Sequence, residues 1–252
     1  MKKRNPFFVG YFPIPKNLRL FLLTLSITII AFFAVVGILA GGTQDDPGQG
    51  AFRFDYGQQT VIGVIELTPY PILRVTKGNK RIKKGHTLML TGNGKLSVQN
   101  RAVPLNGKLA VASGVILQRG DLDMLQLRGG ENGLKAAAGG LPELVTVSLG
   151  KWRLAGEICD GKCLAGAMRP NRGLAHKACA NLCLIGGIPP VFVSSQPIEG
   201  EEFLLITGPN GSPLPELAFD YMAQYISVEA EIIRKGDMLI MQIDPASIKV
   251  LS

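Results

Sequence analysis

The hydrophobic residues of this chain form one long run near the N-terminus and many short runs after it. The long run reads LFLLTLSITIIAFFAVVGILA, from Leu20 to Ala40, and contains no charged residue. A helix rises about 1.5 Å per residue, so a segment of this length spans the roughly 30 Å hydrocarbon core of a bilayer. Helices of soluble cores are rarely apolar on every face for so long. The pattern therefore predicts a transmembrane helix at 20–40.

The short runs predict a mainly β structure for the rest of the chain. A polar, glycine-rich linker at 41–51 precedes them. They consist of β-branched and aliphatic residues, often separated by Gly, Pro, Asn or Asp; examples are TVIGVIEL from Thr60, LAVASGVIL from Leu109 and YISVEAEII from Tyr225. Short strands with turn signals between them are typical of barrels and sandwiches.

An internal repeat divides this β region into two modules. ILQRGDLDMLQL at 116–127 returns as IIRKGDMLIMQI at 232–243, and each copy predicts two strands joined by a Gly-Asp turn. Gly63 and Gly156 lie inside the first predicted strand of each half, where glycine marks a bulge or a sharp bend. Small barrels with a bent first strand indicate OB-like folds. We therefore predict two OB-like β modules, at 52–146 and 147–252, the second with a short helix that carries Cys and His.

The flanking charges set the orientation of the predicted transmembrane helix. The tail at 1–19 contains five basic residues and no acidic one. By the positive-inside rule such a tail stays in the cytoplasm. The alternative is a signal peptide cleaved after Ala40, but signal cores usually span only about 7–15 residues. We expect a single-pass protein of the inner membrane, with its N-terminus cytoplasmic and the bulk of the chain periplasmic.

The positive net charge belongs mostly to that tail. The chain has a formal charge of +8, from 27 basic and 19 acidic residues. Without the five basic residues of the tail, 22 basic residues face 19 acidic ones, which leaves +3 for the exported part. No strong basic field is present for a nucleic acid. We expect the membrane and a membrane or periplasmic protein as partners.

All four cysteines, Cys159, Cys163, Cys179 and Cys183, lie within one short segment. An even number of cysteines in an oxidising compartment predicts disulfides. Cys159–Cys183 with Cys163–Cys179 is one of the three possible pairings. A disulfide framework would need no cofactor.

The alternative interpretation of the same segment is a metal or redox site. Leu174 to Ile185 is expected to be helical, which places His176, Cys179 and Cys183 on one face. Thiolate and imidazole are the ligands that copper and zinc prefer in proteins. An iron–sulfur cluster is less expected outside the cytoplasm. The other histidine, His86, follows a basic turn and is expected at the surface.

Two stretches of the chain resemble a group of poorly characterised bacterial exported proteins. GEICDGKC from Gly156 and HKACANLCLIGGIPP from His176 are similar to its motif GEIxDxKC, which is followed by a glycine-containing spacer and HxxCAxxCIxGGxPP. DDPGQGAFRFDYGQQTVIGVIELTPYPILRV from Asp45 is similar to the opening of a membrane-anchored branch of that group. The resemblance implies that the motif positions are Cys163, His176, Cys179 and Cys183. Cys159 stands where such sequences more often have an apolar residue, and this favours a Cys₃His set over two disulfides.

No other catalytic set is visible, since the chain lacks GxSxG, a Walker loop and HExxH. We expect no independent catalytic activity. Our main hypothesis is a membrane-anchored periplasmic accessory protein that binds a metal, or acts as a redox or thiol site, for a respiratory or oxidoreductase complex. The alternative is a structural membrane-anchored subunit whose cysteines form disulfides and whose β modules dock a partner protein.

Overall fold

The computed structural model describes residues 14–42, 48–141, 143 and 145–251, and it divides into two compact units, Met1–Asp46 and Pro47–Ser252. In the first unit the described residues form the helix α1 (Lys16–Gly42), which contains the predicted 20–40 segment. Among the described helices, α1 alone is long and apolar enough to cross a membrane. The tail residues 1–13 and the linker residues 43–47 lie outside the described residues, and the predicted orientation of the helix stays a prediction.

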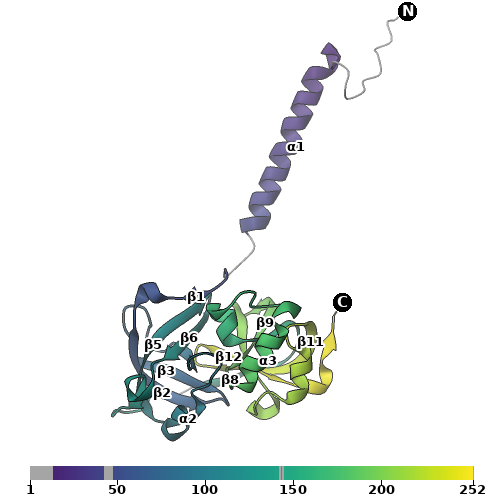
Figure 1. Ribbon diagram of the computed structural model, residues 1–252. Helices are drawn as coiled ribbons and strands as arrows, with labels where there is room; N and C mark the ends of the chain where they lie inside the picture. The colour runs from purple at the N-terminus through teal and green to yellow at the C-terminus, as the bar shows by residue number, and fades with distance from the viewer. Residues whose placement is uncertain (1–13, 43–47, 142, 144, 252) are drawn as a thin grey trace, which may run out of the picture. The chain divides into compact units, whose positions relative to one another are not determined.

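The second unit contains two β sheets, drawn in blue to teal and in green to yellow in Figure 1. The strands of the first sheet are β1 (Ala51–Phe52), β2 (Gln59–Leu67), β3 (Pro71–Lys77), β4 (Thr87–Thr91), β5 (Leu109–Arg119), β6 (Leu122–Leu127) and β7 (Leu134–Ala136). The strands of the second sheet are β8 (Thr146–Asp160), β9 (Pro190–Ile198), β10 (Glu201–Thr207), β11 (Tyr225–Lys235), β12 (Met238–Ile243) and β13 (Lys249–Val250). Two short helices accompany them, α2 (Gln99–Ala102) and α3 (Lys177–Ile185).

Each sheet closes into a barrel of five strands. In the first barrel the order is β5-β2-β3-β4-β6, and β6 pairs back onto β5. In the second barrel the order is β11-β8-β9-β10-β12, and β12 pairs back onto β11. Each barrel has one parallel pair, β4 with β6 and β10 with β12. The predicted mainly β architecture is confirmed, whereas the module boundary at 146/147 stays a prediction; β7 ends at Ala136 and β8 begins at Thr146.

The sequence repeat corresponds to the closing hairpin of each barrel. The first copy forms β5 and β6, joined at Gly120, and the second forms β11 and β12, joined at Gly236. Both turn glycines have positive φ, 55° and 66°, a conformation that glycine adopts without steric cost. The repeated Gly-Asp turn therefore has the same structural role in both barrels.

The two glycines predicted at strand bends are explained by close packing. A Cβ atom on Gly63 would collide with the carbonyl oxygen of Arg74, and one on Gly156 would collide with that of Val193. The register of β2 against β3 shifts between Ile62 and Gly63, which is the predicted bulge. At Gly156, in contrast, β8 keeps its register with both neighbouring strands. Gly156 therefore allows β8 and β9 to approach closely and does not form a bulge.

An apolar seam joins the two barrels, in addition to the core inside each of them. The first barrel contributes Ile72, Met89, Leu117, Leu122 and Met124, and the second contributes Cys159, Leu164, Val191, Phe203, Leu205 and Ile240, among others. Most of these side chains are fully buried. The seam fixes how loops of the first barrel meet the cysteine segment of the second.

His86 bridges the barrels at the edge of this seam, where 27% of its side chain remains exposed; the sequence did not predict the bridge. Its Nε2 lies 2.9 Å from Asp123 Oδ2 in the first barrel, and its Nδ1 lies 2.8 Å from Asp237 Oδ2 in the second. Hydrogen bonds with Asp123 and with Asp237 raise the pKa of His86 from 6.5 to about 9. Nearby, burial and a hydrogen bond with Glu201 raise the pKa of Asp121 to about 8, although Asp121 keeps part of its surface exposed.

We expect His86→Gln to destabilise the protein at neutral pH and to have little effect in alkaline solution. A pKa that is raised on folding contributes stability in full below about pH 6.5, and this contribution is lost as the pH rises through about 9. With discounting for partial exposure, the loss at neutral pH is about 1–2 kcal/mol. Urea unfolding of both proteins near neutral pH and near pH 10 measures it. Because Asp121 titrates in both proteins, the difference between them isolates His86, and an equal deficit at both pH values would contradict the bridge.

Candidate metal centre

The cysteine segment is an insertion between the first two strands of the second barrel. It begins where β8 ends at Asp160 and continues into the helical turn Cys163–Ala167. A loop then leads to a 3₁₀ turn at Leu174–His176 and directly into α3. The helix predicted at 174–185 is thus present, with a tighter first turn that contains His176.

Three thiols converge between the helical turn and α3. The sulfur of Cys163 lies 3.9 Å from the sulfur of Cys179 and 3.9 Å from that of Cys183. All three sulfurs lie within 4.8 Å of one another. Cys163 and Cys183 are buried, whereas Cys179 is partly exposed, and the thioether sulfur of Met168 lies 3.2 Å from the Cys179 sulfur. Three thiol sulfurs therefore face one small volume, and the Met168 sulfur adjoins the most exposed of them, that of Cys179.

A lysine of the first barrel completes the surroundings of these thiols. Lys95 lies between β4 and α2, and its Nζ is 2.7 Å from the Cys179 sulfur and 3.2 Å from the Cys183 sulfur. Partial burial lowers the pKa of Lys95, but hydrogen bonds with these two thiols outweigh burial and raise it. A positive charge therefore lies against the cluster and stabilises ionised thiols.

Hydrogen bonding within the cluster divides the thiols into a donor and an acceptor. The hydrogen bond with Cys183, together with burial, raises the pKa of Cys163. The same hydrogen bond from Cys163 lowers the pKa of Cys183; burial opposes this, and Lys95 supports it. Within this pair Cys163 is consequently the hydrogen-bond donor and Cys183 the acceptor.

His176 belongs to a second group of donors, which shares Cys163 with the first. Its Nε2 lies 2.8 Å from Asp160 Oδ2, while Asp160 Oδ1 accepts the backbone N–H of Cys163 at 2.8 Å. Asp160, Cys163 and His176 offer ligand atoms within 4.8 Å of one another. His176 Nδ1 is buried and has no hydrogen-bond partner. Asp160 therefore holds the end of β8, the Cys163 turn and the start of α3 together.

A second lysine fastens the loop that carries Lys95. Lys162 is buried and donates to the carbonyl oxygens of Gly92 and Gly94, at 2.6 Å and 2.7 Å. Burial lowers the pKa of Lys162. On the other side of the loop, the backbone N–H of Ser97 donates to the carbonyl oxygen of Gly186, at the end of α3, over 2.8 Å. The loop is thus clamped onto the cysteine segment at both ends.

Cys159 lies apart from the other three cysteines. It is fully buried in the apolar seam, and its thiol donates to Glu157 Oε1 at 3.3 Å. Burial, followed by the charge of Glu157, raises its pKa. Neighbouring residues of a strand point to opposite faces, so Cys159 faces the seam while Asp160 faces His176.

No disulfide is present, since all four cysteines lie in the described part of the chain and all are free thiols. The pairing Cys159–Cys183 with Cys163–Cys179 is therefore not seen. The structure brings Cys163, Cys179 and Cys183 together and places His176 beside Cys163, with Asp160 between the histidine and the turn. The sequence did not predict a role for four further residues at this centre, although two of them, Asp160 and Lys162, lie inside the motif GEIxDxKC; the four are Lys95, Asp160, Lys162 and Met168.

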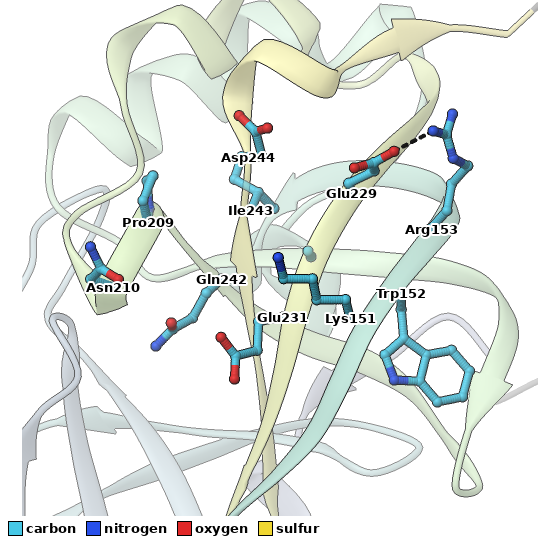
Figure 2. Close-up of a pocket in the computed structure, with 11 residues that line it drawn as sticks. Lys151, Trp152, Arg153, Pro209, Asn210, Glu229, Glu231, Gln242, Ile243 and Asp244 are labelled. Carbon is cyan, nitrogen blue, oxygen red and sulfur yellow. Dashed lines mark hydrogen bonds and ion pairs between the residues drawn. The ribbon is translucent and has the colours of Figure 1, made fainter.

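A surface groove on the second barrel is separate from this centre. It runs across β8, β11 and β12 of the second barrel, and its polar lining includes Lys151, Glu231 and Gln242, with an ion pair between Arg153 and Glu229 (Figure 2). Trp152 also lies at this groove and is 42% exposed. The groove contains no thiol, and it shares no residue with the candidate metal centre.

The chain was compared with protein-family models, with curated proteins and with solved structures, and it matches none of them. The assignment of a function therefore depends on the geometry of the cysteine cluster.

Proposed function

We propose that this chain is a membrane-anchored accessory protein that binds one soft metal ion through Cys163, Cys179 and Cys183. The observation that carries the proposal is the convergence of three thiol sulfurs, from a turn and a helix, within 4.8 Å of one another. Thiolates are the preferred ligands of copper(I) and zinc. A structural role for the thiols alone does not require Lys95 to be held against them.

The fourth ligand distinguishes the two metals. Met168 would complete an all-sulfur set, which suits copper(I). His176 would complete the Cys₃His set predicted from the sequence, which suits zinc. The hydrogen bond from His176 to Asp160 supports a ligand role, because metal-binding histidines commonly donate their other ring N–H to a carboxylate. The unpartnered Nδ1 of His176 is the nitrogen left for a metal.

The surface around the cluster supports a protein partner. Leu96, Leu174, Leu182 and Ile185 are exposed apolar residues on the loop of Lys95 and on the cysteine segment. Exposed apolar side chains next to a polar, functional centre are typical of interaction sites. We propose that a membrane or periplasmic protein of a respiratory or oxidoreductase complex docks here.

We also propose that both barrels are OB-like, with the bulk of the chain in the periplasm. The strand order, in which the third and fifth strands of each barrel pair in parallel, supports the OB-like label. Helix α1 and the basic tail support the location. The alternative of a purely structural subunit depended on disulfides, and no disulfide is seen.

Metal content of the full-length protein tests the function. We expect chains purified in detergent under reducing conditions, and then offered copper(I) or zinc, to retain about one ion after desalting. The metal content found by elemental analysis should rise as the number of reactive thiols falls, because a bound ion protects its cysteine ligands. Loaded protein that retains no metal and still exposes the thiols of the cluster would reject the proposal.

A further inference from the structure

The contact between Lys95 and Cys179 is shorter than an ordinary hydrogen bond to sulfur. An N–H···O bond usually measures about 2.9–3.0 Å, and an N–H···S bond is longer because sulfur is the larger atom. Lys95 Nζ nevertheless lies 2.7 Å from the Cys179 sulfur. A nitrogen and a sulfur atom that are both bonded to the same oxygen atom lie about this far apart.

The loop geometry holds this pair in place before any reaction. Lys95 Nζ also donates to the carbonyl oxygen of Cys179, at 3.2 Å, so the side chain is aligned along α3. Lys162 and Gly186 clamp the loop on its two sides. Prepositioned groups react far more readily than free ones, because the entropy of bringing them together has already been spent.

Cys179 is also the thiol of the cluster that a dissolved oxidant can reach. It is partly exposed, whereas Cys163 and Cys183 are buried. Lys162, the other lysine at the cluster, donates to the carbonyl oxygens of Gly92 and Gly94 and to no thiol. The close amine–thiol contact and the access of oxidant therefore coincide at Lys95 and Cys179.

We propose that Lys95 and Cys179 form a modification site, at which molecular oxygen links the two side chains through a covalent nitrogen–oxygen–sulfur bridge. In this reaction two N–H bonds of the Lys95 ammonium and the O–O bond break, while an N–O bond to Lys95 and an S–O bond to the Cys179 thiolate form. One oxygen atom enters the bridge, and the other leaves as water with the two hydrogens. Nitrogen and sulfur each lose two electrons, and the oxygen molecule gains four.

The bridge would act as a redox switch on the proposed metal site. It removes the Cys179 thiolate from the ligand set, so the oxidised protein loses metal affinity. Two equivalents of dithiothreitol supply the four electrons and four protons that restore the amine, the thiol and one water. This consequence rests on the proposed function, whereas the bridge itself does not.

Peptide mass spectrometry of the full-length protein, exposed to air in detergent, tests the bridge. We expect a peptide containing Lys95 joined to one containing Cys179, with the summed mass plus one oxygen atom and minus two hydrogens. The joined peptide should disappear after treatment with dithiothreitol. Separate Lys95 and Cys179 peptides throughout, or oxidation of Cys179 without linkage, would overturn the proposal.

Two matched pairs of variants make the test specific. Lys95→Arg keeps the positive charge but should abolish the linkage, while Cys159→Ala removes a thiol with no lysine contact and should leave it unchanged. In Gly186→Ala the new Cβ would collide with the carbonyl oxygen of Lys95, which should displace the loop and reduce the linkage several-fold. Gly129→Ala, where a Cβ meets no atom within 4 Å, should have no effect. Equal linkage in Gly186→Ala and Gly129→Ala would contradict the prepositioned geometry.

Metal binding by the same samples separates the two proposals. Air-exposed protein should bind several-fold less metal than reduced protein, in proportion to the linked fraction. A linkage without metal binding in the reduced protein would reject the proposed function and leave the bridge standing. Metal binding in the reduced protein without any linkage in air would reject the bridge and leave the proposed function standing.

Discussion

Cys163→Ala should lose metal binding, because Cys163 supplies the thiol that both groups of donors share. Its sulfur lies 3.9 Å from the sulfurs of Cys179 and Cys183, and it is also grouped with Asp160 and His176. Loss of a direct ligand should exceed the roughly 10–100-fold loss in affinity that is typical for residues behind the ligands. Competition titration of the reduced protein against a chelator of known affinity measures this change.

Cys159→Ala is the matched control, since it removes a buried thiol of the same segment that lies in the seam and outside the cluster. It should bind metal as the wild type does. Equal losses in Cys159→Ala and Cys163→Ala would mean that the thiols affect metal binding only through folding. That result would contradict the assigned ligand set.

The same titration identifies the fourth ligand. If His176 completes the set, His176→Ala should weaken binding about as much as Cys179→Ala, and Met168→Leu should change little. If Met168 completes the set, Met168→Leu should weaken binding and His176→Ala should change little. Asp160 remains in both variants, so the turn that holds Cys163 keeps its hydrogen bond.

The second large effect is expected for Gly156→Val, which should destabilise the second barrel by about 3 kcal/mol or more. A Cβ atom at this position would collide with the carbonyl oxygen of Val193 and come within 2.8 Å of the Phe192 ring. Both neighbours belong to β9, and Phe192 is fully buried in the barrel core. The side chain has no space into which it could move without separating β8 from β9.

Urea unfolding followed by tryptophan fluorescence measures this destabilisation directly. Trp152 is the single tryptophan of the chain and lies on β8, so it reports the second barrel. Gly129→Val is the control, because a Cβ there meets no atom within 4 Å and the backbone φ of −67° accepts any side chain. Similar midpoints for both variants would show that Gly156 does not set the approach of β9.

The candidate site could be predicted only in part from the sequence. The spacing of Cys179 and Cys183 on one helical turn fixes their common face, because residues four apart are neighbours on any α-helix. The sulfur of Cys163 lies beside those of Cys179 and Cys183, and the resemblance to the motif GEIxDxKC had implied that Cys163 belongs to the same site. His176 lies in the 3₁₀ turn before α3 and is bonded to Asp160, so helical spacing alone does not describe its position. Hydrogen-bond partners of this kind leave no periodic signal in a sequence.

What the sequence determined by itself was local: the apolar helix, the short strands, the repeated Gly-Asp hairpins and the helix that carries two cysteines. These features follow from hydrophobic periodicity and turn chemistry, which act between residues close together in the chain. The tertiary structure alone decided that Lys95 meets Cys179, 84 residues away, and that Cys159 is buried in the seam. The physical reason is that such contacts depend on how two closed barrels pack against each other, and this packing is the sum of many apolar contacts that no single stretch of sequence specifies.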